Sequence, residues 1–404
     1  MGICFELLPD TQLRVICSVQ QWDSDEPIPQ SELLAGIAGK DGLFCLLSDR
    51  IDKEVLDAAG PSLKVISTLS VGYDHLAIPE IKKRGIRVGY TPDILTDATA
   101  ELTVALLLAT SRRLPESVLE VKNGGWTTWK PLWMCGYGLS GSTVGIIGLG
   151  RIGLAVARRL KPFGVKRFLY AGCHPKPEAD AELNAEFGGP VKWKEAISSS
   201  GLEIIPGGSE GAKTNSGSYQ SRVRDCDLLS AKADRTEAGT VGFPNWSHSN
   251  DIKETNKVME ETDLLLVEEM EELASLPIAK LAEESDFVIV TCSLTPDTQG
   301  MCNRDFFSKM KKTSVFINTS RGAVVNQDDL YEALVNGHIA AAGLDVTTPE
   351  PLPTNNPLLS LKNCVILPHI GSATYATRNT MSVLAANNLL AGLKGESMPS
   401  ELRL

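Results

Sequence analysis

The sequence predicts an α/β protein that contains two doubly wound parallel sheets and a largely irregular insertion. Short apolar runs that end in polar or turn residues alternate with helical patterns, which is typical of an open parallel sheet. This alternation occurs in two separate series along 404 residues, a length sufficient for two or three domains. Between residues 188 and 276 the second series is interrupted by a segment with little periodicity.

The first series predicts one domain and the helix that leaves it. Its expected strands are "GLFCLLSD" near residue 42, "LKVISTLSVG" near residue 63 and "RGIRVGYTP" near residue 84. The helix "TAELTVALLLATSRRL" follows, and it is apolar on almost every side between Leu102 and Ala109. Because a helix of that kind is buried, we expect it to connect two domains.

The second series begins at Val144 and predicts the other domain. A strand "VGIIG", an amphipathic helix "RIGLAVARRLKPFG" and a strand "VKRFLYAG" come first. Four later apolar runs predict further strands, namely "DFVIVTCS", "TSVFINTS", "AAGLDV" and "NCVILPH". Five or six such strands separated by helices make a doubly wound domain. The last helix, "RNTMSVLAANNLLAGL", is expected to fold back on the first domain.

The expected domain boundaries follow from these two series. The first domain comprises residues 1–98 and 376–404, and the second comprises residues 99–375 with the insertion at 188–276. The insertion is rich in Gly, Ser and Asn and carries 16 acidic against 9 basic residues. Such a composition predicts a solvated, largely disordered segment, and an acidic surface that binds a partner is the alternative.

The composition narrows the class of protein. With 43% hydrophobic and 22% charged residues, the chain has the balance of an ordinary soluble globular protein. Its net charge of −11 argues against nucleic acid or an anionic membrane surface as the main partner. No apolar run approaches the ~20 residues that span a bilayer, and "MGICFELLPD" lacks the pattern of a signal peptide. Nine cysteines without a C-x-x-C pair favour reduced thiols in the cytoplasm, and no metal site is predicted.

A glycine-rich turn predicts a dinucleotide site of the Rossmann type. In "GIIGLGRIG", the three residues Gly148, Gly150 and Gly153 have the G-x-G-x-x-G spacing. They permit a tight turn, close approach of the backbone to a pyrophosphate, and close packing of the helix that begins near Arg151. A glycine-rich turn without a ligand is the alternative, but the motif follows a strand and opens an amphipathic helix, which favours dinucleotide binding.

The loop after the next strand bears on the identity of the cofactor. An NAD site has an acidic residue at this point to bind the ribose hydroxyls, but "LYAGCHPKPE" contains none before Glu178. Ala171, Gly172 and Cys173 cannot take that role. The absence of a carboxylate permits a 2′-phosphate, which His174 and Lys176 could attract unless they are only solvated surface residues. NADP is therefore favoured and NAD remains possible.

Three polar side chains at strand ends predict the chemistry. His369 ends the strand in "CVILPHIGSAT", Arg321 follows the strand in "FINTSRG", and Glu350 follows another strand in "GLDVTTPEP". A carboxylate beside an imidazole favours the protonated ring, and a guanidinium can bind a carboxylate through two nitrogens. Together they predict hydride transfer to a 2-oxo acid, with His369 as the proton donor. A histidine that only caps the strand is the structural alternative.

The motifs "VGIIGLGRIG", "INTSRG", "GLDVTTPEP" and "LPHIGSAT", in this order, resemble the D-2-hydroxyacid dehydrogenases. The resemblance is closest to the animal branch that reduces glyoxylate and hydroxypyruvate, and it covers nearly all of residues 20–187 and 277–404. It implies a flavodoxin-like substrate domain made from both ends of the chain, a Rossmann dinucleotide domain, and a homodimer.

The resemblance also implies the role of individual residues. The implied catalytic residues are Arg321, Glu350 and His369. The implied substrate-binding residues are Leu47, Val71, Gly72, Arg321, Asp345 and Ser372, with Trp129 of "NGGWTTWKPLW" entering the active site of the second subunit. The implied cofactor contacts are Gly150, Arg151, Ile152, Ser293, Thr319, Asp345 and Gly371. The glycine turn and the loop after the next strand add Gly148, Gly153, Cys173, His174 and Lys176 to the predicted cofactor site.

Three features depart from the family pattern. The first strand and helix are replaced by the shorter "MGICFELLPDTQLRVICSV", which is expected to leave the sheet of the first domain underpacked. Cys173 stands where the related animal enzymes have an arginine for the 2′-phosphate. The insertion begins shortly after that loop.

The function that follows is NAD(P)H-dependent reduction of hydroxypyruvate to D-glycerate and of glyoxylate to glycolate in the cytoplasm. A different 2-oxo acid as substrate is one alternative. The other is a nucleotide-sensing scaffold or an inactive variant of the same fold that binds a partner through the acidic insertion. A scaffold does not need a proton donor with its carboxylate, so the residues favour the enzyme.

Overall fold

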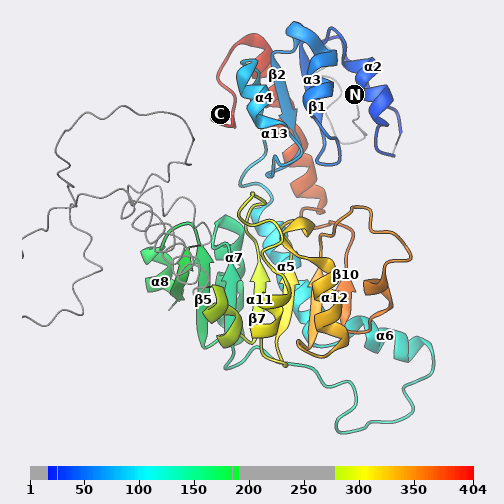
Figure 1. Cartoon of the computed structure of the whole chain (residues 1–404), viewed down its shortest axis with the longest axis vertical. Coiled ribbons are helices and arrows are strands. Elements are labelled where there is room, and N and C mark those ends of the chain that lie inside the picture. Colours follow the sequence, from blue (N-terminus) through cyan, green and yellow to red (C-terminus); the bar gives the residue numbers. More distant parts are fainter. Residues whose placement is uncertain (1–16, 25, 184, 191–277) are drawn as a thin grey trace, which may run out of the picture. The chain divides into compact units, whose positions relative to one another are not determined.

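The computed structural model describes residues 17–24, 26–183, 185–190 and 278–404, which form two parallel sheets (Figure 1). The smaller sheet has three strands and the larger has seven, and every neighbouring pair of strands runs in parallel. The α/β fold class with parallel sheets, predicted from the alternating pattern, is therefore confirmed.

The smaller sheet has the strand order β1-β2-β3, and its strands are the three apolar runs predicted near residues 42, 63 and 84. The elements of this part are β1 (Gly42–Cys45), β2 (Val65–Thr68), β3 (Arg87–Gly89), α2 (Gln30–Ile37), α3 (Lys53–Ala59), α4 (Ile78–Lys83) and α13 (Tyr375–Lys394). Helix α13 packs against all three strands, although it comes from the far end of the chain. The Thr374 side chain caps its start by accepting a hydrogen bond from the Thr377 amide.

The larger sheet has the strand order β10-β9-β8-β7-β4-β5-β6. Its strands are β4 (Thr143–Ile147), β5 (Arg167–Gly172), β6 (Ala185–Pro190), β7 (Phe287–Val290), β8 (Val315–Asn318), β9 (Ala341–Leu344) and β10 (Cys364–Ile366). Its helices are α5 (Thr96–Ser111), α6 (Leu114–Lys122), α7 (Arg151–Leu160), α8 (Pro177–Leu183), α11 (Arg304–Lys309) and α12 (Gln327–Val335). The strand order reverses at the β4–β7 pair, which is the switch point where doubly wound sheets bind ligands.

Helices cover both faces of the larger sheet, and the side chains of a single strand alternate between them (Figure 1). In β7, Val288 and Val290 belong to a buried cluster that includes residues of α11 and α12. Phe287 and Ile289 of the same strand belong to a second buried cluster that includes residues of α5 and α7. Burial on both faces explains why the strands of this sheet are nearly continuous apolar runs in the sequence.

The structure differs from the sequence prediction at the start of the insertion. Five or six strands were expected in the larger sheet, with the insertion beginning at residue 188. Strand β6 instead continues through residues 188–190 to Pro190 and makes a seventh strand at the edge of the sheet. A proline is tolerated at an edge because its missing N–H faces away from the neighbouring strand, so "GGP" did not end the strand. The remaining residues of the predicted insertion lie outside the described part, as do residues 1–16.

Candidate active site

A cavity of about 220 Å³ lies where several loops that follow parallel strands converge. Its lining comes from the loops after β1 and β2, from those after β7, β8, β9 and β10, and from residues of α5, α7 and α13. Eleven of the residues predicted from the sequence are among those that line it: Leu47, Val71, Gly72, Ile152, Ser293, Thr319, Arg321, Asp345, His369, Gly371 and Ser372. The carboxyl edge of a parallel sheet is where such folds place their chemistry.

His369 and Glu350 form a hydrogen-bonded pair at this cavity. Nδ1 of His369 lies 2.8 Å from Oε2 of Glu350, and Oε1 of Glu350 accepts a hydrogen bond from the Thr347 amide at 2.9 Å. Burial raises the pKa of Glu350, but the hydrogen bond and charge of His369, with the Thr347 amide, outweigh it and leave that pKa below its ordinary value. An ionised carboxylate only accepts hydrogen bonds, so Nδ1 carries the proton of this bond. Nε2 is thereby left for a ligand.

Asp345, at the end of β9, fixes the backbone that carries His369. Its carbonyl oxygen accepts from the His369 amide, and its two carboxylate oxygens accept from the amides of Ile370 and Gly371, each at 2.8 Å. His369 has a φ of 54°, in the left-handed region that a residue with a side chain rarely adopts. Asp345 is 2% exposed, and burial raises its pKa despite the two amide bonds. The proton-bearing ring is thus held by a buried carboxylate.

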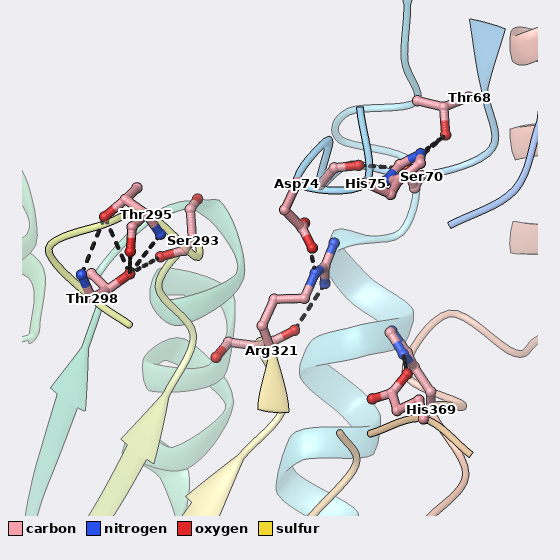
Figure 2. A network of polar contacts seen from close by, with 12 residues as sticks. Thr68, Ser70, Asp74, His75, Ser293, Thr295, Thr298, Arg321 and His369 are labelled. Carbon is pink, nitrogen blue, oxygen red and sulfur yellow. Dashed lines mark hydrogen bonds and ion pairs between the residues drawn. The ribbon is translucent and has the colours of Figure 1, made fainter. Parts of the chain in front are cut away.

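Arg321 follows β8, and its guanidinium has defined partners (Figure 2). Nε donates to Oδ1 of Asp74 at 2.9 Å, and Nη1 donates to the carbonyl of Ser320 at 2.9 Å. The Arg321 carbonyl in turn accepts from Nδ2 of Asn318, the last residue of β8. A Cβ atom at Gly72 would clash with Nη2 of Arg321, so the guanidinium lies directly against the backbone of that glycine.

The loop that carries Gly72 is anchored by a buried polar network. Oγ1 of Thr68 lies 3.0 Å from Oγ of Ser70 and 2.9 Å from Nε2 of His75 (Figure 2). Ser70 donates to the carbonyl of Gly72 at 2.5 Å. Burial lowers the pKa of His75 to about 4, with opposing effects of the Asp74 and Arg321 charges, so the ring is neutral at physiological pH. Within the described residues, the amides of Val71 and Gly72 donate to no backbone acceptor.

The glycine turn between β4 and α7 fits a pyrophosphate. Gly148 has a φ of 94°, and a Cβ there would lie 2.5 Å from the backbone of Cys292, so the turn needs a glycine. A Cβ at Gly153 would lie 2.5 Å from the Gly148 carbonyl, which shows how closely α7 approaches the turn. Beside Gly150 there is open space, and no side chain caps the first amides of α7. Free amides at a helix N-terminus bind anions, so this turn can hold the phosphates of a dinucleotide.

The remaining predicted residues lie outside the cavity lining. Cys173, His174 and Lys176 are exposed in the loop after β5, where the Lys176 amide donates to the hydroxyl of Tyr170 at 2.6 Å. Arg151 forms an ion pair with Asp93, and Trp129 is 79% exposed in the segment after α6.

Sequence reasoning missed several residues of the cavity, above all Asp74, Ser70 and Cys292. Asp74 is the first charge after the predicted substrate loop in "LSVGYDH", and a charge beside such a loop was the available signal. Cys292 lies two residues after the end of β7, and this position after a strand was a signal that it lines the cavity.

Two absences apply to the described part of the chain. No group of three or more His, Cys, Asp or Glu side chains there could hold a metal ion. No helix there combines the length and apolar character needed to cross a membrane.

Comparisons with known proteins agree with this geometry. Residues 104–201 and 256–371 match the family model "D-isomer specific 2-hydroxyacid dehydrogenase, NAD binding domain". The chain is 58% identical over 388 residues to the human glyoxylate reductase/hydroxypyruvate reductase, with 96% of this chain and 92% of that protein covered.

Solved structures are similar as well. A Thermus thermophilus protein has a TM-score of 0.67 at 34% identity, and the match covers 96% of this chain and 92% of the other. The NADPH-dependent glyoxylate/hydroxypyruvate reductase of Sinorhizobium meliloti, in complex with NADP and malonate, has a TM-score of 0.62 at 28% identity, with coverages of 90% and 83%.

The half-buried His75, whose pKa is lowered, predicts a loss of stability in acid. The unfolded chain takes up a proton near pH 6.5, whereas the folded chain takes it up only near pH 4, so stability falls as the pH drops below about 6.5. Between pH 7.5 and 5 the free energy of unfolding should fall by about 2 kcal/mol through this residue. In urea denaturation, His75→Gln should remove that part of the pH dependence, whereas His338→Gln, at an exposed position, should not. Equal pH slopes for wild type and His75→Gln would contradict the assignment.

Proposed function

Because the chain belongs to the D-isomer specific 2-hydroxyacid dehydrogenase family, we propose that it reduces small 2-oxo acids with a nicotinamide cofactor. Hydroxypyruvate and glyoxylate are the proposed substrates, and D-glycerate and glycolate are the products. The observation that carries this proposal is the hydrogen bond between His369 and Glu350, with His369 lining the same cavity as Arg321. The activities for which the human and Sinorhizobium relatives are named support the choice of substrates.

The residues of the cavity divide the work between binding and proton transfer. Arg321 and the amides of Val71 and Gly72 bind the substrate carboxylate, which places the 2-oxo group near His369. When bound, the reduced nicotinamide cofactor supplies the hydride that the carbonyl carbon receives. Protonated His369 gives its Nε2 proton to the carbonyl oxygen, so that the ketone becomes an alcohol. Glu350, which is ionised, holds Nδ1 and stabilises the charged ring.

We propose NADP(H) as the preferred cofactor. Residues 171–176, at the end of β5 and in the loop after it, include no carboxylate. His174 and Lys176 are exposed in this loop, and β5 pairs with β4, the strand that leads into the glycine turn. The Lys176 amide donates a hydrogen bond to the Tyr170 hydroxyl, and this bond limits where the Lys176 side chain can reach. The similar Sinorhizobium protein is described as NADPH-dependent and was solved with NADP. Cys173 is too short and uncharged to replace an arginine at a 2′-phosphate.

We also propose that the protein acts as a homodimer that forms through helix α6 and the segment after it. An unusual number of large apolar side chains is exposed there: Leu114, Val118, Leu119, Val121, Trp126, Trp129 and Leu132. Leu132 is 86% exposed and Trp129 is 79% exposed, so both leave most of their apolar surface in water in a single chain. Contiguous apolar surface of this kind marks a protein interface. In the dimer, Trp129 would reach the cavity of the second subunit.

The sequence also suggests a cellular location and an alternative function. Cytoplasmic location is supported by the free thiols of all seven cysteines in the described part of the chain. The scaffold alternative depends on residues 188–276, most of which lie outside the described residues. No described contact favours it over the enzyme.

The replacement His369→Asn tests the proposed reaction. Asparagine tolerates the left-handed backbone of this position but cannot donate the proton, so kcat for hydroxypyruvate should fall ~10²- to 10⁴-fold. The measurement is NADPH oxidation, followed by absorbance, with NADPH affinity measured separately by fluorescence. His338→Asn, at an exposed position, should retain full activity. Wild-type protein that is folded and binds NADPH but reduces neither hydroxypyruvate nor glyoxylate would refute the proposed function.

Lys176→Ala tests the cofactor preference. Because a single exposed ion pair contributes little, KM for NADPH should rise roughly 2- to 5-fold while KM for NADH stays unchanged. Lys312→Ala removes an equally exposed lysine elsewhere and serves as the control. A wild-type enzyme that prefers NADH, or a variant that weakens both cofactors alike, would argue against this role.

Leu119→Glu tests the dimer. A charge in the centre of the exposed apolar surface of α6 should dissociate the subunits, so sedimentation velocity should show the mass of one chain. Leu359→Glu places the same charge at another exposed leucine and should leave the dimer intact. A wild-type protein that sediments as a monomer at micromolar concentration would contradict the proposal.

A further inference from the structure

Two of the three guanidinium nitrogens of Arg321 already have protein partners. Nε is held by Asp74 and Nη1 by the Ser320 carbonyl, both at 2.9 Å. Nη2 lies against Gly72, in the loop after β2 that lines the cavity. An arginine side chain can rotate about several bonds, and each bond it makes to the protein removes part of that freedom. The direction of Nη2 is therefore set by the two other nitrogens.

Asp74 is a suitable partner because it is itself held in place and partly shielded. The exposed fractions of the Arg321 and Asp74 side chains are 24% and 32%, so water screens the pair less than it would on an open surface. Asp74 lies between Gly72, whose carbonyl accepts from Ser70, and His75, whose ring contacts Thr68 (Figure 2). The polar network behind the loop therefore holds the backbone from which the Asp74 side chain extends.

The ion pair also determines what Arg321 offers to a ligand. A free guanidinium can grip a carboxylate through Nε and Nη2 together, but Asp74 occupies Nε here. Only the Nη2 edge remains, beside the amides of Val71 and Gly72. An incoming carboxylate would thus be bound by one charged donor and two amides, which fixes its orientation more closely than the guanidinium alone.

We propose that Asp74 is a positioning residue, which holds Nε of Arg321 so that Nη2 and the amides of Val71 and Gly72 together bind the substrate carboxylate. This inference rests on the proposed function, since it takes a 2-oxo acid as the ligand. Asp74 itself does not touch the substrate. Its loss should weaken binding of the carboxylate and leave the proton-donating pair His369–Glu350 intact.

The test compares Asp74→Ala and Asp74→Asn with wild type. Asp74→Ala should raise KM for hydroxypyruvate roughly 10- to 100-fold, the effect of losing a hydrogen bond to a charged group, while kcat changes less than about 3-fold. Asp74→Asn keeps an oxygen that can accept from Nε, so its KM should lie between those of wild type and Asp74→Ala. NADPH affinity, measured by fluorescence, should be unchanged. Asp57→Asn weakens exposed ion pairs on helix α3, away from the cavity, and is the control.

Several results would overturn the proposal. One is a fall in kcat with an unchanged KM, and another is an equal loss of NADPH affinity, since a merely structural role would disturb both sites. If Asp74→Ala fails to fold, Asp74→Asn is used instead. A wild-type KM in Asp74→Asn, together with wild-type affinity of this variant for the substrate analogue oxamate, would also count against the proposal.

A binding measurement separates this proposal from the proposed function. Oxamate, an unreactive analogue of a 2-oxo acid, is titrated calorimetrically into the protein with NADPH present. If wild type binds oxamate and Asp74→Ala binds it at least about tenfold more weakly, the role of Asp74 stands even where no turnover is seen. If wild type binds no oxamate, the proposed carboxylate-binding site and the role of Asp74 are both refuted.

Discussion

The hydrogen bonds between Asp345 and residues 369–371 are the constraint on which the geometry of the cavity depends. Three consecutive amides donate to one residue at the end of a central strand. The left-handed backbone of His369 costs about 1–2 kcal/mol, and two charge-assisted hydrogen bonds are sufficient to offset it. The loop that carries the imidazole is therefore anchored to the end of β9, which is the condition for orienting a proton donor.

Charged side chains at and around the cavity lie near groups of opposite charge. His369 has Glu350, and Arg321 has Asp74, while the partly buried Arg378, whose pKa is lowered by burial, lies within the electrostatic reach of Asp345. Because most charges are already balanced, the cavity does not attract every anion equally. The donors there that suit a carboxylate include one edge of Arg321 and two amides on the loop after β2, and Nε2 of His369 remains for a neighbouring carbonyl. A small carboxylate with an adjacent carbonyl matches that limited set of donors better than a larger polyanion does.

The sequence was informative wherever a single local rule decides the structure. Apolar runs gave the strands of both sheets, the glycine spacing gave the turn at Gly148, and charges after strands gave Arg321, Glu350 and His369. Strand β6 was missed because its last residues are Gly and Pro, which are typical of loops, although an edge strand tolerates them. Asp74 was missed because its partner, Arg321, is 247 positions away, and no local pattern shows such a contact. The role of Trp129 depends on a second chain and stays a prediction.

The position of the interrupting segment explains how the cavity can be complete in this chain. Residues 191–277 connect β6, at the edge of the larger sheet, to the part of the chain that leads into β7. The residues that line the cavity follow β4, β7, β8, β9 and β10, or come from α5, α13 and the loops of the smaller sheet, and none follows β6. Lengthening a connection costs only about 0.6 kcal/mol for each doubling of its length, far less than breaking the pairing of central strands would. Extra chain at this edge can therefore be accommodated without altering the bonds that hold Arg321, Glu350 and His369.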